Sequence, residues 1–169
     1  ERYDGYGNSI RRVMEQKESK KGIVGVVADI IKVDKKYETA IETALGGNIQ
    51  NIVTDDESVA KEMIEFLKSN KLGRATFLPL TSVKDRGEFQ KPEALKEKGV
   101  IGIAATLVKT DSKYQEVVSQ LLGAIIVVDH IDHAIALSKK YHYQLRIVTI
   151  EGEYLTPGGA IAGGAFKNN

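Results

Sequence analysis

The sequence contains no cysteine and no tryptophan, and it has only three prolines and two methionines. Without cysteine the chain has neither disulfide bonds nor thiolate metal ligands, which fits a reducing cytosol. No apolar run is long enough to span a bilayer, and no signal peptide precedes the first predicted strand. The 24 lysines and arginines are balanced by 23 acidic residues, so charge does not favour nucleic-acid binding over the whole surface. We expect one medium domain or two small subdomains, and the polar ends suggest a fragment of a longer protein.

Glycine is concentrated in one stretch near the end of the sequence, GEYLTPGGAIAGG. Five of the thirteen residues from Gly152 to Gly164 are glycine, and no side chain that carries chemistry stands among them. A backbone without side chains allows positive φ angles and the close approach of another group. That group is a phosphate, a neighbouring strand of the same chain, or a second copy of the protein.

The sequence also contains an internal repeat. Residues 22–46 and residues 99–123 align without a gap, and nine of the 25 positions are identical. Further on, Asp55 aligns with Asp129, and the RATFL stretch aligns with Arg146 to Ile150. Two related halves, 22–80 and 99–155, should therefore share one order of strands and helices and pack about a pseudo-twofold axis. The glycine stretch follows the second half and has no counterpart in the first.

The spacing of apolar residues predicts the elements of the first half. A strand with a bend near Ala28–Asp29 covers residues 22–33, a helix follows Asp34 and ends at Gly46–Gly47, and a short strand covers Ile49–Thr54. The next helix is capped by Asp55 or Asp56 and turns Val59, Met63, Ile64 and Leu67 inward. The same criteria predict a helix capped at Asn8–Ser9, a strand at Arg74–Leu78 that Pro79 ends, and one helical turn at Pro92–Lys96.

No catalytic site is predicted. The sequence has no phosphate-binding loop and no nucleophile motif, and a glycine stretch without a following helix is a poor dinucleotide loop. Asp129, His130, Asp132 and His133 form the pattern D-H-x-D-H. Two histidines three residues apart on a helix suggest a metal site, but a polar first helical turn capped by Asp129 explains the pattern more simply. We therefore predict no metal site.

Four basic pairs are spread along the chain, at Arg11–Arg12, Lys20–Lys21, Lys35–Lys36 and Lys139–Lys140. Scattered pairs on a neutral chain are typical of a soluble surface. If some of them converge in space, they would contact phosphate backbones without reading bases.

Four stretches carry a resemblance to a known family: GYGNSIRRVME, YETAIETALGGNIQNIVTDD, GRATFLPL and RIVTIEGEYLTPGGAIAGG. The last contains the pattern G-x6-G-x3-G-G at Gly152, Gly159, Gly163 and Gly164. The chain resembles the hinge domain of SMC (structural maintenance of chromosomes) proteins, most closely the bacterial chromosomal type. The resemblance implies a mixed α+β fold of two related subdomains, each with a small mixed sheet and packed helices.

The resemblance implies that residues 22–80 form subdomain I, residues 99–164 form subdomain II, and residues 81–98 connect the two. Residues 1–21 are expected to join a coiled-coil arm, and residues 165–169 to lead toward the arm. The hinge is a non-enzymatic homodimerisation module of a chromosome-segregation ATPase. ATP and magnesium belong to distant head domains, and the fragment itself has no cofactor, no small-molecule substrate and no membrane partner. The expected location is the cytoplasm, on the nucleoid.

The resemblance also implies where partners bind. We expect the glycine stretch to present an open strand edge to a second copy, and the strand Ile49–Thr54 to receive it. The predicted dimer-interface residues are Gly46, Gly47, Gly152, Leu155, Gly158, Gly159, Gly163 and Gly164, with Ile161 and Ala160 buried beside them. Weak DNA binding with a preference for single strands is expected at Arg11, Arg12, Lys20, Lys21, Lys139, Lys140 and Lys167. The alternative is a nucleotide- or metabolite-binding enzyme domain that uses the glycine stretch as an anion cradle.

Overall fold

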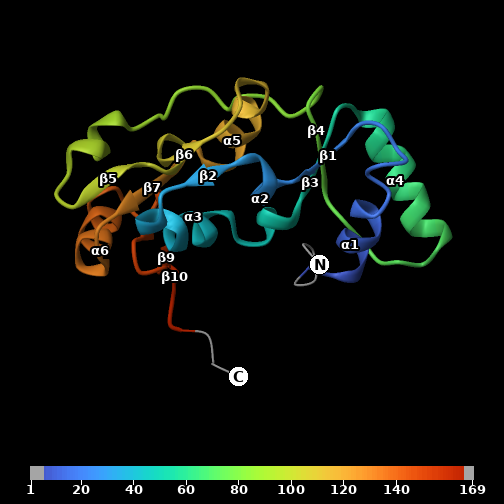
Figure 1. The fold of residues 1–169 in the computed structure, drawn as a ribbon. Coiled ribbons are helices and arrows are strands. Elements are labelled where there is room, and N and C mark those ends of the chain that lie inside the picture. Colours follow the sequence, from blue (N-terminus) through green and yellow to red (C-terminus); the bar gives the residue numbers. More distant parts are fainter. Residues whose placement is uncertain (1–5, 166–169) are drawn as a thin grey trace. The chain divides into compact units, whose positions relative to one another are not determined.

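The computed structural model describes residues 6–165 (Figure 1). Two compact units make up the chain, and each draws segments from both halves of the repeat. Among the described residues, unit 1 contains those up to Ile31, Gly47–Asp85 and Thr110–Val117, and unit 2 contains Lys32–Gly46, Arg86–Lys109 and those from Val118 onward. The compact units are thus interleaved in sequence, whereas the predicted subdomains were continuous segments.

Unit 1 is built on a three-stranded sheet in the order β1-β3-β4, formed by β1 (Ile23–Val26), β3 (Ile52–Thr54) and β4 (Phe77–Pro79). β3 is antiparallel to β1 and parallel to β4. The helix α4 (Glu57–Ser69) packs against β3, β4 and the helix α1 (Asn8–Met14). Their apolar faces form a core of Ile10, Val13, Met14, Ile23, Val26, Ile52, Val59, Met63 and Leu67.

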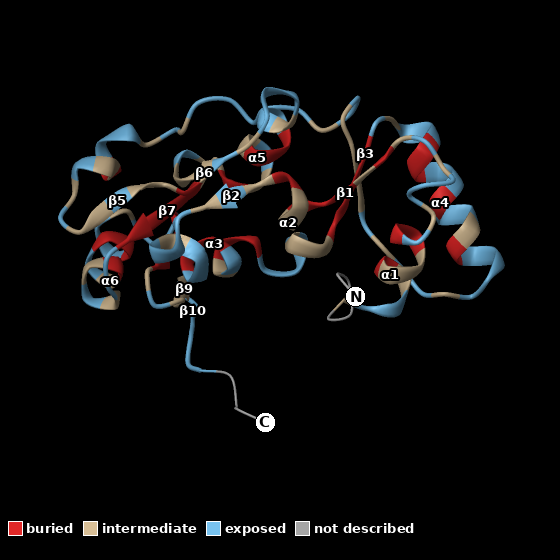
Figure 2. Ribbon diagram, in the orientation of Figure 1, coloured by how far each residue is buried: buried red, intermediate tan, exposed pale blue. Residues whose placement is uncertain are grey.

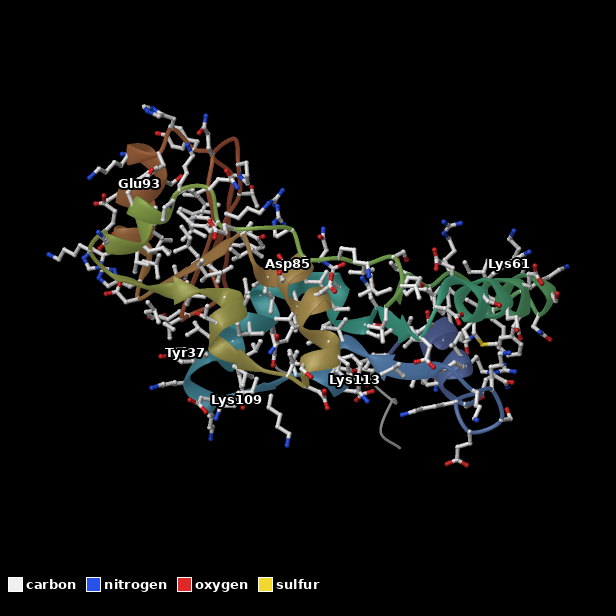
Figure 3. The ribbon with its side chains drawn as sticks, turned by 90° about the horizontal axis from the view of Figure 1, so that it is seen from above. Tyr37, Lys61, Asp85, Glu93, Lys109 and Lys113 are labelled. Carbon is white, nitrogen blue, oxygen red and sulfur yellow. The ribbon has the colours of Figure 1, made fainter. Side chains whose placement is uncertain are left out.

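The helix α4 forms where its capping residue and apolar spacing predict. Asp56 is the N-cap, and its carboxylate accepts a hydrogen bond from the Val59 N–H at 3.0 Å. Lys61 lies on the exposed face, where Figure 3 labels it. The inward position of Ile64 was wrong, because Ile64 is 40% exposed. It follows Met63 directly and so lies about 100° further around the helix, outside the buried stripe.

The predicted cap of α1 was also wrong. Gly7 occupies the N-cap position without a side-chain hydrogen bond, and Asn8 is already the first helical residue. The apolar face of this helix was predicted correctly, since Ile10, Val13 and Met14 are buried.

Unit 2 is built on a five-stranded sheet in the order β10-β9-β8-β7-β5. Its strands are β5 (Val100–Ile103), β7 (Ile125–Val128), β8 (Arg146–Thr149), β9 (Tyr154–Leu155) and β10 (Ile161–Ala162). β7 is buried at every residue (Figure 2). The helix α6 (Ile131–Lys140) packs against β7, β8 and β9, and the helix α3 (Glu38–Leu45) packs against β8. The core contains Ala94, Ile126, Val128, Ala134, Leu137, Leu145, Ile147 and Leu155.

The predicted bend at Ala28–Asp29 is a single helical turn, α2 (Val27–Ile30). After it, β2 (Lys32–Val33) pairs antiparallel with β6 (Val108–Lys109) in a separate two-stranded sheet. α3 begins at Glu38 after a 3₁₀ turn at Lys35–Tyr37, and α5 (Gln115–Leu122) follows the equivalent turn in the second half. A further 3₁₀ turn at Pro92–Lys96 confirms the helical turn predicted there. None of the described helices is long and apolar enough to cross a membrane.

The strand registers define which residues of the two halves are equivalent. Ile23 lies opposite Thr54 in the first half and Val100 lies opposite Val128 in the second, and each pairing has a bulge at the following glycine. Phe77 lies opposite Ile52, and Ile147 lies opposite Ile126. Phe77 therefore corresponds to Ile147 and Pro79 to Thr149. The sequence alignment of RATFL with Arg146–Ile150 was wrong by two residues.

Candidate functional site

The glycine stretch forms a hairpin at one edge of the five-stranded sheet. β9 and β10 are antiparallel, with Ile161 opposite Leu155 and Ala162 opposite Tyr154. The turn between them is closed by a hydrogen bond from the Thr156 N–H to the Ala160 carbonyl at 3.0 Å. On its outer side β10 has no paired strand among residues 6–165. The sheet thus ends in an open strand edge at β10, the strand labelled next to β9 in Figure 1.

Exposure divides the predicted interface residues into two groups. All residues from 157 to 165 are exposed, which includes Gly158, Gly159, Gly163 and Gly164. The side chain of Ile161 is 51% exposed, the largest exposed fraction of any large apolar residue in the described structure. Leu155, directly opposite on β9, is only 2% exposed and belongs to the core of unit 2. Leu155 therefore packs within its own chain instead of being left for a partner.

Gly152 lies in the turn from β8 to β9, with φ +96°. A Cβ atom at this position would lie 3.0 Å from Thr39 Cγ2 and 3.3 Å from Thr43 Oγ1 on α3. The glycine is needed there because the turn both adopts a positive φ and passes close to a helix of the same chain. This role is internal packing.

Gly46 ends α3 as its C-cap residue, and Gly47 lies in the 3₁₀ turn that follows, Gly46–Gln50. The strand predicted to receive the glycine stretch, Ile49–Thr54, begins only at Ile52, as β3. That pairing was wrong, because β3 lies between β1 and β4 and both of its edges are already hydrogen-bonded.

β4 has an edge that no described strand pairs. The Ile52 N–H donates to the Thr76 carbonyl at 2.9 Å, and the Leu80 N–H donates to the Thr54 carbonyl at 2.8 Å. Backbone groups alternate along a strand, so Phe77 and Pro79 direct theirs away from β3. In the second half the Thr149 N–H donates to the Glu153 carbonyl at 3.0 Å and starts the return into β9. Pro79 occupies the equivalent position and has no N–H to donate.

Tyr143 was missed by the sequence interpretation. It is 45% exposed and has a positive φ of 59°, directly after His142 with φ 60°. Its carbonyl accepts a hydrogen bond from the Gly158 N–H at 2.8 Å. Two successive non-glycine residues in the left-handed region are strained, and such strain is typical of functional surfaces. Only the aromatic run around His142 could have drawn attention to it in the sequence.

The candidate DNA-binding residues differ in how freely they can contact a phosphate. Lys20 Nζ binds Glu62 at 2.7 Å, Lys140 Nζ binds Glu97 at 2.7 Å, and Arg12 Nε lies 3.2 Å from Glu15. The hydrogen bond to Glu97 raises the pKa of Lys140. Arg11 Nε is buried without a hydrogen-bond partner in the described structure. Lys21 and Lys139 are exposed and form no ion pair within residues 6–165, and Lys167 lies outside the described residues.

The start of α6 contains the D-H-x-D-H pattern, and its capping residue differs from the prediction. His130 is the N-cap, and its Nδ1 accepts the Asp132 N–H at 3.2 Å. Asp129 precedes the cap, and its Oδ1 lies 2.7 Å from His133 Nδ1. Since an ionised carboxylate only accepts, this nitrogen carries the proton. The hydrogen bond lowers the pKa of Asp129.

No helix follows the glycines through residue 165, so the described structure offers no helix N-terminus for an anion at this stretch. What the site offers is backbone: one open edge on β10 and one on β4, each beside apolar side chains. Such edges bind other strands and are poorly suited to chemistry.

Comparison with known proteins identifies the class. Residues 20–138 match the family described as SMC proteins Flexible Hinge Domain. The chain belongs to this family of SMC hinge domains. The fold class is the one predicted from the sequence, and the hinge is a non-catalytic part of an SMC protein.

The chain is 40% identical over 168 residues to the chromosome partition protein Smc of Bacillus subtilis (strain 168), covering 98% of this chain and 14% of that protein. A crystal structure of an asymmetric dimer of the Geobacillus stearothermophilus SMC hinge domain matches with a TM-score of 0.91 and 40% identity, covering 98% of this chain and 69% of that one. The Pyrococcus furiosus SMC hinge domain matches with a TM-score of 0.76 and 37% identity, covering 96% and 83% of the two chains. The chain thus spans about one seventh of the curated relative, 14% of its length.

Proposed function

We propose that two copies of this hinge domain bind each other through the open edge of β10 and so join the two arms of a chromosome partition SMC protein. The observation that carries the proposal is the edge strand with Ile161 half exposed, at 51%, in a chain that matches a solved hinge dimer. An apolar strand edge left open would promote aggregation, so a folded partner is expected to cover it.

The receiving strand in this proposal is β4 of the other copy. Both strands have unpaired backbone groups, and both lie beside apolar side chains, Ile161 on β10 and Phe77 on β4. Pro79 has no N–H, so the chain after β4 cannot form the hydrogen bond by which Thr149 turns the chain into β9. The edge of β4 is therefore left for another chain. Each copy contributes one β10 and one β4, so a symmetric pair makes two equal contacts. A stable pair needs roughly 1,000 Å² of buried surface.

The exposed glycines act in this pairing by letting the second backbone approach. Gly163 and Gly164 directly follow β10 and are exposed, and a large side chain there would separate the two strands. Gly158, Gly159 and Tyr143 form the other end of the hairpin surface. Gly46 caps α3 and Gly47 lies in the 3₁₀ turn that follows, so the pairing of β10 with β4 assigns neither of them a role.

The wider setting is part of the proposal and is supported by the similarity to chromosome partition proteins. In the complete protein, ATP and Mg²⁺ would act at head domains outside this chain, and the hinge would serve chromosome segregation on the nucleoid in the cytoplasm. The hinge itself would need no cofactor for dimerisation.

Sedimentation equilibrium tests the dimer. Ile161→Asp places a charge on the open edge and should give a folded monomer, and Gly163→Glu with Gly164→Glu should do the same. Ile64→Asp is the matched control, because Ile64 is also a large apolar residue, 40% exposed, but lies on the helix α4 and not on a strand. An unchanged dimer mass in Ile161→Asp, or an equal effect in the control, contradicts the proposal.

Cross-linking tests the receiving strand. The chain has no cysteine, so introduced thiols are the only ones present. One chain carrying Ala162→Cys and another carrying Leu78→Cys should form a covalent dimer when mixed and oxidised. A covalent dimer of Ala162→Cys alone would place two β10 strands together and reject β4 as the partner.

Weak binding of single-stranded DNA is a further part of the proposal, supported by two of the candidate residues, Lys21 and Lys139, which are exposed and form no ion pair in the described structure. Lys21→Glu and Lys139→Glu should each weaken binding and lower the salt slope by about 0.7 for each phosphate that the variant no longer neutralises. Lys61→Glu on α4 is the control. A fluorescence-anisotropy titration in which all three variants match the unmodified chain contradicts this role.

A further inference from the structure

We propose that Asp129, His130 and His133 bind one divalent first-row transition metal ion, with Zn²⁺ as the reference case. One ligand atom from each of these residues lies within 4.8 Å of the others. The centroids of the two imidazole rings of His130 and His133 lie 4.2 Å apart, and the ring planes are tilted by 31°. All three side chains belong to unit 2 and reach the solvent at the start of α6.

The backbone holds this cluster in place. The Asp129 N–H donates to the Gly99 carbonyl at 2.9 Å, and Asp129 Oδ1 accepts the His130 N–H at 2.7 Å and lies 2.7 Å from His133 Nδ1. Gly99 has φ +86°, and a Cβ atom at this position would overlap both His133 Nδ1 and Asp129 Oδ1. Residue 99 therefore has no side chain because the aspartate–histidine pair occupies that space.

The first half of the chain provides an internal comparison. By the strand registers and the helix caps, Asp55 corresponds to Asp129, Asp56 to His130 and Val59 to His133. Gly22 faces Val59 as Gly99 faces His133. On the same backbone, the first half has an ordinary carboxylate cap and an apolar contact, whereas the second half has two imidazoles beside a carboxylate. A cap and a packing contact do not require this pair of substitutions.

The donor set fits borderline metal ions. Imidazole and carboxylate ligands suit Zn²⁺, Ni²⁺ and Cu²⁺, whereas Mg²⁺ prefers oxygen ligands alone. Asp129 Oδ1 and His133 Nδ1 lie 2.7 Å apart, so both atoms can face one ion once Nδ1 has released its proton to solvent.

Binding requires a small rearrangement. Ligand atoms about 2.0–2.1 Å from a tetrahedral zinc ion lie closer together than 4.8 Å. The exposed ring of His130 must turn inward, and the metal competes with the Asp132 N–H for its Nδ1 lone pair. With three protein ligands, a four-coordinate ion keeps one position for water or for a group from another molecule.

Isothermal titration calorimetry with ZnCl₂ tests this site on the 169-residue chain. We expect one zinc ion per chain and no heat of binding with MgCl₂. The double variant His130→Asn, His133→Val should lose binding. Asparagine can still cap the helix, and valine matches Val59 in the first half, so the variant should keep its fold by circular dichroism.

His142→Ala is the control, because His142 is the third histidine of the chain and lies outside the cluster. Asp129→Asn should weaken zinc affinity by more than about 10-fold, because it removes one of the three ligands. The proposal is overturned if the unmodified chain does not bind zinc, if the double variant binds it equally well, or if His142→Ala alone removes binding. Imidazole NMR signals of His130 and His133, but not of His142, should shift on zinc addition. None of these outcomes depends on dimerisation.

Discussion

The sheets of the two halves begin alike and end differently. β1-β3-β4 and β5-β7-β8 share their strand directions, their registers and a bulge after the first paired residue. In the second half, β9 and β10 continue the sheet beyond β8, whereas no described strand continues the sheet beyond β4. The second half therefore has two added strands that end in the open edge of β10, and the first half keeps an open edge at β4, where the equivalent of β9 would lie.

A single pair of residues accounts for much of this difference. At Thr149 the N–H donates to Glu153 and the hydroxyl accepts the Glu153 N–H at 3.0 Å, which closes the turn into β9. At Pro79 no N–H is available, and the Pro79 carbonyl instead accepts the N–H of Val83 at 2.9 Å as the chain turns away. Duplication followed by divergence at this turn would give one domain two different edges suited to each other.

The helices after β3 and β7 differ in the same manner. Each helix begins after an N-cap residue whose side chain accepts a backbone N–H, Asp56 before α4 and His130 before α6. The shared cap shows that local backbone geometry was kept while the side chains changed. Variants at matched positions can therefore separate what each half needs for folding from what it needs for binding.

The largest effect is expected from the two residues that face each other across the hairpin. Leu155→Ala should lower the free energy of unfolding by about 2–5 kcal/mol, because Leu155 is only 2% exposed. Ile161→Ala should change it by less than about 0.5 kcal/mol, because Ile161 is a surface residue in the monomer. Urea unfolding at concentrations that keep the chain monomeric measures both. Equal losses would place Ile161 in the core and remove it from the proposed interface.

Gly152 and Gly158 give a smaller effect with a built-in control. Both have positive φ, +96° and +98°, but only Gly152 has side-chain atoms of α3 close to where a Cβ would lie. Strain alone should cost about 1–3 kcal/mol at either position on substitution by alanine. Gly152→Ala should cost more than Gly158→Ala, and thermal unfolding of the two variants measures the difference. A larger loss of stability in Gly158→Ala would contradict this prediction, because it would mean that close packing against α3 is not what makes Gly152 the more sensitive position.

The smallest effect is expected at the helix caps. Asp56→Ala should cost about 0.5–2 kcal/mol, because Asp56 accepts the Val59 N–H at 3.0 Å. His130→Ala should cost less, because its imidazole accepts the Asp132 N–H at the longer distance of 3.2 Å. Thermal unfolding in the presence of EDTA excludes any contribution from bound metal. A larger loss at His130 under these conditions would reverse the expected order of the two caps.

Local patterns predicted the helices well. The buried positions Ile41, Ala44 and Leu45 of α3 and the cap Asp56 of α4 follow from spacing and side-chain chemistry within a few residues. The failures have physical reasons too. Ile64 is apolar yet lies just outside the buried stripe, and Asp129 lost the capping role because its neighbour His130 also offers an acceptor at the correct position.

The amino-acid sequence alone determined the repeat, the cluster of glycines and the membership of the hinge family, since all three are readable along the chain. Only the folded chain decided which strand edges remain open, because pairing joins segments far apart in sequence. It left β10 and β4 unpaired at one edge each, enclosed β3 between two strands and buried Leu155 opposite the exposed Ile161. It also brought Asp129, His130 and His133 together against Gly99. Spacing along one strand does not specify its neighbours, and that is why the predicted partner of the glycine stretch was wrong.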